Sequence, residues 1–275
     1  RRQRQMCIRD RAPLGRFAQP TGHHRVPVML GTNRDEMKVF LFASSRHVRR
    51  VLWVLPRLRD PERYEAEARV HSAAWQVVGA DAPAEAIVRS GFEDVFVYRW
   101  DWDEEPSRLG ADLGRMLGAS HGFEIPFVFG HFYLGPLADV VWTEENLPGR
   151  LELSAAMMSY WSEFARAGDP GRGARGDQPQ WQRWGSAGPG RGPRMVFDTR
   201  SGGGVRLDAG ATSASDVVAL LGTHSATLGR DGACEMAEAL DDRFRGISTA
   251  ARSGLAACRE RTGPGGSGLA SVRDD

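Results

Sequence analysis

Runs of apolar residues predict buried strands at two places in the chain. Residues 26–30 read Val-Pro-Val-Met-Leu, and residues 95–100 read Val-Phe-Val-Tyr-Arg-Trp. Short apolar runs bounded by turn residues are typical of strands in a parallel sheet. Two further runs, 195–197 and 205–207, flank three glycines at 202–204 and predict a hairpin.

Apolar residues at helical spacing predict helices between and after these strands. Residues 61–90 predict two consecutive helices that end near Gly91, and residues 151–167 predict a long one that ends at Gly168. A weaker helical pattern covers residues 233–245. Strands that alternate with helices in this way favour an α/β fold.

Composition and charge exclude several classes of protein. The chain has 275 residues with 41% hydrophobic and 26% charged positions, which are the proportions of a globular protein. Its 36 basic residues nearly balance its 35 acidic ones, so we expect no nucleic-acid partner. No apolar run approaches the ~18 residues of a transmembrane helix, so we expect no membrane span. The basic residues are arginines except for Lys38, which indicates a GC-rich gene of bacterial type.

Cysteine and histidine usage points away from a disulfide framework and from a metal site. The three cysteines, Cys7, Cys234 and Cys258, allow at most one bridge, and free thiols in a reducing compartment are the simpler alternative. The adjacent pair His23 and His24 lacks a nearby third ligand. We therefore expect neither a metal nor another cofactor, and the cellular location stays open.

The first segment that could carry chemistry is Gly31–Glu36, which follows the first predicted strand. Ligands and catalytic groups gather at this end of the strands in open α/β sheets. An acid in such a place orients a histidine and stabilises its imidazolium. The alternative is that Asp35 and Glu36 lie in the first turn of a helix that Thr32 or Asn33 caps.

The second segment, residues 118–130, reads Gly-Ala-Ser-His-Gly-Phe-Glu-Ile-Pro-Phe-Val-Phe-Gly. Its histidine, His121, follows the stronger predicted strand and has small neighbours, which leave room for a substrate or a nucleophile. We expect the other six histidines to be incidental. Glu124 is expected either to bond buried groups beneath this loop or to be a partly exposed carboxylate without a role.

Both segments resemble the type-B carboxylesterase and cholinesterase family of serine hydrolases. In that family a Gly-x-x-x-Asp-Glu stretch after a strand supplies the acid of a catalytic triad, and a Gly-Ala-x-His-Gly-x-Glu stretch supplies the histidine. Residues 157–170, which end in Gly-Asp-Pro, resemble the family's late helix. The resemblance covers roughly residues 25–200 and implies an α/β-hydrolase fold, with a mostly parallel sheet and flanking helices.

The resemblance also implies roles for individual residues. It makes Glu36, rather than Asp35, the triad acid, and it makes His121 the general base that hydrolyses a carboxylic ester by acyl transfer. Met37 departs from the family, which often has glycine after the acid.

Aromatic residues near the histidine are candidates for a pocket that holds the small-molecule ester. Trp100, Trp102 and Phe123 could line an apolar pocket of this kind, and packing between the sheet and its helices is the alternative. The acidic run at residues 101–105 predicts a solvated loop.

The third triad member is missing from the sequence. In this fold the chain order is nucleophile, acid, histidine, and the nucleophilic serine stands in Gly-x-Ser-x-Gly. No serine precedes Glu36, so the motif is absent from the part of the chain where this order requires it. Its spacing occurs only at residues 118–122, which follow the acid and contain the histidine itself. Ser120 adjoins His121 without an elbow, and Gly222–Ala226 is a near match on the wrong side of the histidine.

We therefore expect the chain to be the C-terminal part of an α/β-hydrolase domain, with the N-terminal half as its missing partner. By itself it is expected to be inactive on esters. The alternatives are a non-catalytic binding module of the same superfamily and a fragment without independent activity.

The expected organisation of the chain has three parts. Residues 1–11 predict a non-native leader, because Met6–Asp10 resembles the translation of a sequencing adapter. Residues 12–262 form the C-terminal part of the carboxylesterase domain. Residues 263–275, which are rich in glycine and polar side chains, predict a flexible tail.

Overall fold

The computed structural model describes residues 13–52, 55–186, 188, 192–245 and 247–248. The predicted leader at residues 1–11 and the predicted tail at residues 263–275 lie outside the described residues.

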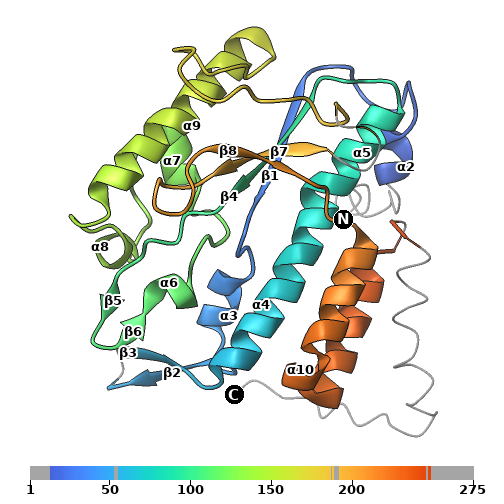
Figure 1. The fold of residues 1–275 in the computed structure, drawn as a ribbon. Helices are drawn as coiled ribbons and strands as arrows, with labels where there is room; N and C mark the ends of the chain where they lie inside the picture. The colour runs from blue at the N-terminus through green and yellow to red at the C-terminus, as the bar shows by residue number, and fades with distance from the viewer. Residues whose placement is uncertain (1–12, 53–54, 187, 189–191, 246, 249–275) are drawn as a thin grey trace, which may run out of the picture.

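A four-stranded mixed sheet forms the centre of the fold (Figure 1). Its strands are β1 (Val28–Asn33), β4 (Val95–Trp100), β7 (Pro193–Phe197) and β8 (Arg206–Ala209), and they lie in this order. β1, β4 and β7 run parallel, and β8 is antiparallel to β7. The mixed α/β class and the predicted strands and hairpin are therefore confirmed.

Helices cover both faces of this sheet. α9 (Leu147–Ala167) and the short α7 (Ile125–Phe129) lie on one face, and the helices between β1 and β4 lie on the other (Figure 1). Because successive side chains of a strand point to opposite faces of the sheet, β4 contributes side chains to the core on both faces. Phe96 and Trp100 pack with residues of α9, whereas Val95 and Val97 pack with residues of α5.

The helical segment between β1 and β4 is continuous. It consists of α4 (Pro61–Gln76), a π-helical turn η1 (Val77–Asp81) and α5 (Ala82–Arg89). The side chain of Asp60 caps α4 by accepting the backbone N–H of Arg63 at 3.0 Å. The two predicted helices over residues 61–90 are confirmed, and a π-turn joins them in place of a loop.

The last helix, α10 (Ala214–Arg243), is much longer than the predicted segment 233–245. It packs along α4 (Figure 1), and its buried residues share a core cluster with those of α4. Its N-terminus has a complete capping box between Ser213 and Asp216. The helix is interrupted at Gly229, and packing on α4 outweighs the weak helix propensity of its glycines.

One cysteine of this helix, Cys234, is disulfide-bonded. The alternative of a free thiol is therefore wrong for this residue. Cys7 and Cys258 lie outside the described residues.

Short elements complete the described fold. They are α2 (Pro13–Phe17), α3 (Lys38–Ala43), β2 (Val48–Val51), β3 (Leu55–Leu58), β5 (Ser107–Arg108), β6 (Ala111–Asp112), α6 (Leu113–Met116) and α8 (Ala138–Val141). α3 begins later than the sequence predicts, and neither Thr32 nor Asn33 caps it, because both belong to β1. The predicted end of α9 is confirmed, since Gly168 adopts φ 73° there.

The acidic run at residues 101–105 is not the solvated loop that its charge predicts. The residues Asp101 and Glu105 are only 2% and 6% exposed. Arg99 donates to both carboxylate oxygens of Asp101, at 2.6 and 2.7 Å. Burial raises the pKa of the Glu105 carboxyl well above its ordinary value.

No helix in the described part of the chain is long and apolar enough to cross a membrane.

Candidate active site

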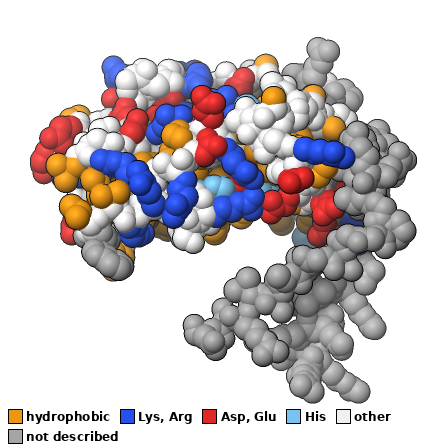
Figure 2. Space-filling model, turned by 90° about the horizontal axis from the view of Figure 1, so that it is seen from below, with side chains coloured by type: hydrophobic (Ala, Val, Ile, Leu, Met, Phe, Trp, Pro, Cys, Tyr) orange, Lys and Arg blue, Asp and Glu red, His pale blue; other side chains and the backbone are white. Residues whose placement is uncertain are grey.

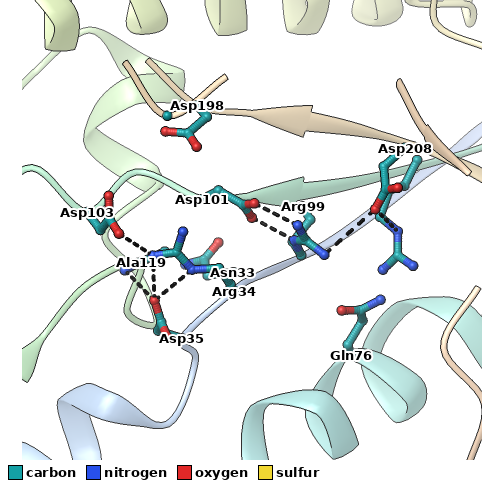
Figure 3. A network of polar contacts seen from close by, with 12 residues as sticks. Asn33, Arg34, Asp35, Gln76, Arg99, Asp101, Asp103, Ala119, Asp198 and Asp208 are labelled. Atoms are coloured by element: carbon teal, nitrogen blue, oxygen red, sulfur yellow. Dashed lines mark hydrogen bonds and ion pairs between the residues drawn. The ribbon is translucent and has the colours of Figure 1, made fainter. Parts of the chain in front are cut away.

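Charged residues crowd the edge of the sheet where the three parallel strands end. β1 leads into Arg34 and Asp35, β4 into Asp101 and Asp103, and β7 into Asp198 (Figure 3). The carboxyl ends of parallel strands are the usual place for sites in α/β folds. The topology thus brings polar groups from distant parts of the sequence to one edge.

The two residues predicted to act together are in contact at this edge. Nδ1 of His121 lies 2.7 Å from Oε2 of Glu36. The Glu36 side chain is 5% exposed and that of His121 is 48% exposed, so a buried carboxylate supports an accessible imidazole. When Nδ1–H donates to Glu36, the neutral ring carries its lone pair on Nε2, where it can accept a proton.

Glu36 is fixed from its other side by the end of β1. The backbone N–H of Asn33 donates to Oε1 at 2.8 Å, so both carboxylate oxygens are bonded. Burial raises the pKa of the Glu36 carboxyl, and the hydrogen bonds from Asn33 and His121 oppose that rise by stabilising the carboxylate. The acid therefore has a single orientation towards the histidine.

The side chain of Asn33 connects the acid segment to the histidine loop. Its Nδ2 donates to the carbonyl oxygen of Ser120 at 2.7 Å and to Oε2 of Glu124 at 2.5 Å. Glu124 thus bonds a buried group beneath the loop, as one of its two alternatives predicts. The sequence indicates Asn33 only as a helix cap, and its position at the end of a strand was the signal for a role in the site.

Ion pairs surround the dyad along the strand edge. Arg34 contacts Oδ2 of Asp35 at 3.0 Å and Oδ2 of Asp103 at 2.6 Å, and it lies between them in Figure 3. Burial lowers the pKa of the Arg34 guanidinium, but these carboxylates outweigh it and leave that pKa raised. Burial, together with Asp101 and Asp103, raises the pKa of Asp198 to about 6.

Two aromatic rings flank the imidazole. The Trp75 ring centroid lies 5.0 Å from that of His121, and the Phe40 centroid lies 5.6 Å from it. The two aromatic rings stack on each other at 6.1 Å with an interplanar angle of 17°. The helical pattern indicates α3 and α4 but does not show that one residue of each meets at His121.

The three aromatic residues predicted for a substrate pocket lie in the core instead of on an open surface. Trp100 and Trp102 are fully buried, and Phe123 is 2% exposed. The ring centroid of Trp100 lies 5.1 Å from that of Phe127, and the Trp102 centroid lies 5.3 Å from that of Trp142. A place in a pocket stays a prediction for these three residues.

The serines near the histidine do not face it as nucleophiles. Ser120 is fully buried, and its hydroxyl donates to the carbonyl oxygen of Leu117 at 2.5 Å. The near match Gly222–Ala226 lies inside α10. Within the described residues, no group of three or more His, Cys, Asp or Glu side chains could hold a metal ion.

Comparison with known proteins shows a family to which this chain is similar. The model of the carboxylesterase family matches residues 59–195, a range that includes His121 and follows Glu36. Human cocaine esterase is 38% identical over 111 residues, which are 40% of this chain and 18% of that protein. Para-nitrobenzyl esterase of Bacillus subtilis is 27% identical over 157 residues, which are 53% of this chain and 30% of that protein.

Two further proteins are similar to this chain. Acetylcholinesterase of Electrophorus electricus is 38% identical over 98 residues, or 34% of this chain and 14% of that protein. The solved structure of a PNB esterase matches with a TM-score of 0.45 and 21% identity, over 72% of this chain and 38% of that one. The chain spans less than a third of the length of the curated relatives named here. Residues 59–195, about half of the chain, belong to the carboxylesterase family.

Proposed function

We propose that this chain supplies the general base and its orienting acid to a carboxylic ester hydrolase. The observation that supports the proposal is the 2.7 Å contact between His121 Nδ1 and Glu36 Oε2, in which a buried carboxylate holds a half-exposed imidazole. The names of the relatives, which are esterases and a cholinesterase, point to the same reaction class.

The proposed reaction proceeds by two acyl transfers. A serine hydroxyl attacks the ester carbonyl carbon while Nε2 of His121 takes its proton, and the imidazolium then gives that proton to the departing alcohol. Water repeats the sequence on the acyl-serine and releases the acid. Glu36 stays ionised throughout and stabilises the imidazolium, a role that its two hydrogen bonds support.

The proposal assigns the serine to a segment outside these 275 residues. In this fold the nucleophile comes before the acid, and the chain has no serine before Glu36. We propose that the chain forms the C-terminal part of a hydrolase domain and that the remainder of the domain carries the serine. Loss of the nucleophile from such a triad costs about 10⁶-fold in rate, so this chain alone would not turn over esters.

The test is the esterase activity of the protein as its gene encodes it. With p-nitrophenyl acetate and butyrate, His121→Ala should lower kcat by about 10⁴-fold or more, and Glu36→Ala should lower it to a similar extent. His131→Ala, at an exposed histidine ten positions further along the chain, is the matched control and should keep full activity. Full activity of His121→Ala would overturn the proposal, and an inactive parent that still binds esters would favour the binding module.

A further inference from the structure

Two small hairpins lie side by side at one corner of the molecule. β2 and β3 form the first, and β5 and β6 form the second, at the lower left of Figure 1. The guanidinium of Arg57 on β3 donates to the carbonyl oxygen of Leu109, in the turn of the second hairpin, at 2.5 Å. This contact joins the first hairpin to the turn of the second, and the proposed ester hydrolysis makes no use of either hairpin.

Each hairpin presents a leucine to solvent at its turn. Leu52 is 82% exposed and Leu109 is 85% exposed, the two highest values among the exposed large hydrophobic side chains of the described residues. Both have left-handed backbones, with φ of 49° and 50°, and they are the only residues other than glycine with positive φ in the described part of the chain. Leucine is disfavoured in that conformation, and strained positions of this kind cluster where a residue serves a function.

The surroundings of these leucines are strongly basic. Residues 44–59 contain five arginines and no acidic residue. Arg49 and Arg50, which follow each other on β2, are both exposed, and the structure shows no ion pair for either among the described residues. The face seen in Figure 2 carries basic (blue), hydrophobic (orange) and acidic (red) side chains next to one another.

Acidic side chains balance part of this charge, since Arg46 pairs with Glu235 at 3.0 Å and Glu145 interacts electrostatically with Arg108. Asp60 accepts the backbone N–H of Arg63 at the start of α4, and Asp112 accepts that of Arg115 at the start of α6. Both carboxylates thus serve as helix caps. Arg108, on β5 beside Leu109, adds a further exposed guanidinium to the same corner.

We propose that this corner, formed by Leu52, Leu109, Arg49, Arg50 and Arg108, docks onto an anionic lipid bilayer. The leucines enter the acyl boundary, and the guanidinium groups bind lipid phosphates. Each turn presents a single protruding apolar side chain. The acyl region of a bilayer is deformable and can accommodate such side chains, whereas a rigid protein partner would need a matching pocket for each. The positive charge complements the negative surface of such a membrane.

Docking at this corner would hold the protein that contains the dyad at the lipid surface. Leu109 is connected to His121 by β6, α6 and the start of the histidine loop, without any long excursion. If the proposed function holds, the substrates would include esters that partition into membranes. The docking itself requires no catalysis, so it is measured without substrate, and its failure is distinct from that of the hydrolase proposal.

The test is co-sedimentation of the protein, as its gene encodes it, with vesicles. Vesicles of phosphatidylcholine are compared with vesicles that also contain phosphatidylglycerol. We expect binding to the anionic vesicles only, and we expect high salt to weaken it. Because each arginine near an anionic surface contributes about fivefold in partitioning, Arg49→Ser with Arg50→Ser should lower binding roughly 20-fold.

The apolar anchors are tested separately. Leu52→Ser with Leu109→Ser should lower binding to the same vesicles by about tenfold or more. The matched controls are Arg166→Ser with Arg200→Ser, and Leu151→Ser, at exposed positions away from the hairpins. Thermal melts show whether each variant keeps its fold.

Three outcomes would overturn the proposal. They are equal binding to neutral and anionic vesicles, an equal loss in the control variants, and no binding to either vesicle. The last outcome would leave an acidic protein as the partner of this corner.

Discussion

Asp35 and Ala119 are joined by two hydrogen bonds, and each residue is the donor in one and the acceptor in the other. The backbone N–H of Asp35 donates to the carbonyl oxygen of Ala119 at 3.0 Å, and the backbone N–H of Ala119 donates to Oδ2 of Asp35 at 3.2 Å. Gly118 permits this approach, since its φ is 52° and a Cβ there would lie 2.7 Å from Oδ2. The residue before the acid thus fixes the loop that carries His121.

We expect Asp35→Ala to lower kcat on p-nitrophenyl esters about 10- to 100-fold, with a smaller change in KM. The loop would lose its anchor, and a small displacement of His121 is costly for proton transfer. Asp35→Asn keeps an oxygen that can accept from Ala119 and should retain most of the activity. Asp177→Ala, at an exposed carboxylate, is the control. An unchanged kcat in Asp35→Ala would contradict this role.

Tyr64 connects two elements that border the site, and its loss should destabilise the fold. Its buried hydroxyl lies 3.0 Å from the carbonyl oxygen of Lys38 and 2.5 Å from that of Met116. Tyr64→Phe leaves these buried carbonyls without this donor, so the free energy of unfolding should fall by about 1–2 kcal/mol in denaturant titrations. Tyr133→Phe, at a residue that is 71% exposed, should have no such effect.

Trp75 should hold the imidazole in its productive orientation. Its ring packs against that of His121 on one side and carries the guanidinium of Arg243 at 5.7 Å. Trp75→Ala removes this support, so we expect kcat to fall about tenfold, the range of a positioning effect. Trp75→Phe keeps a ring and should recover most of that loss. The prediction fails if both variants behave alike in steady-state kinetics.

Asp198 should make stability depend on pH in mildly acidic solution. Because the folded state raises its pKa from 3.8 to about 6, the proton is bound more tightly in the folded chain. The stability from this group is complete below pH 3.8 and is lost as the pH rises through about 6. Asp198→Asn keeps the acceptor for the backbone N–H of Thr199. Because asparagine does not ionise, this substitution also removes the loss of stability above pH 6.

We therefore expect Asp198→Asn to exceed the parent in free energy of unfolding by about 1–2 kcal/mol at pH 8 and by little at pH 4. Urea titrations at the two pH values measure the difference. Asp139→Asn, at an exposed carboxylate, is the control and should change the free energy of unfolding only slightly at either pH. If Asp198→Asn raised the free energy of unfolding most at pH 4, the predicted direction of the pH dependence would be wrong.

The strands and α9 could be predicted because apolar runs and helical spacing are local signals. The pair Glu36 and His121 could be predicted only through the resemblance to a family, since nothing local connects residues so far apart. Most of α10 escaped prediction because its glycines give a weak pattern and its stability comes from α4.

The remaining parts of the site depend on tertiary placement. Trp75 meets His121 because α4 crosses the end of β1, which no pattern within α4 indicates. The burial of Asp101 and Glu105 also escaped prediction, because a run of acidic residues has the same appearance in the sequence whether it lies in solvent or is covered by the rest of the fold. Side-chain bonds such as those of Asn33 become visible only once the loops are placed.

The separation of 85 residues between Glu36 and His121 also bears on how the protein reaches its native state. Helices such as α4 close local contacts early and at little entropic cost, whereas this pair requires that β1 and β4 align in parallel after a long crossover. Recovery of helical signal after dilution from denaturant therefore says little about the dyad. The imidazole–carboxylate contact reports a non-local step of assembly, and it is a stricter measure of correct folding than secondary structure.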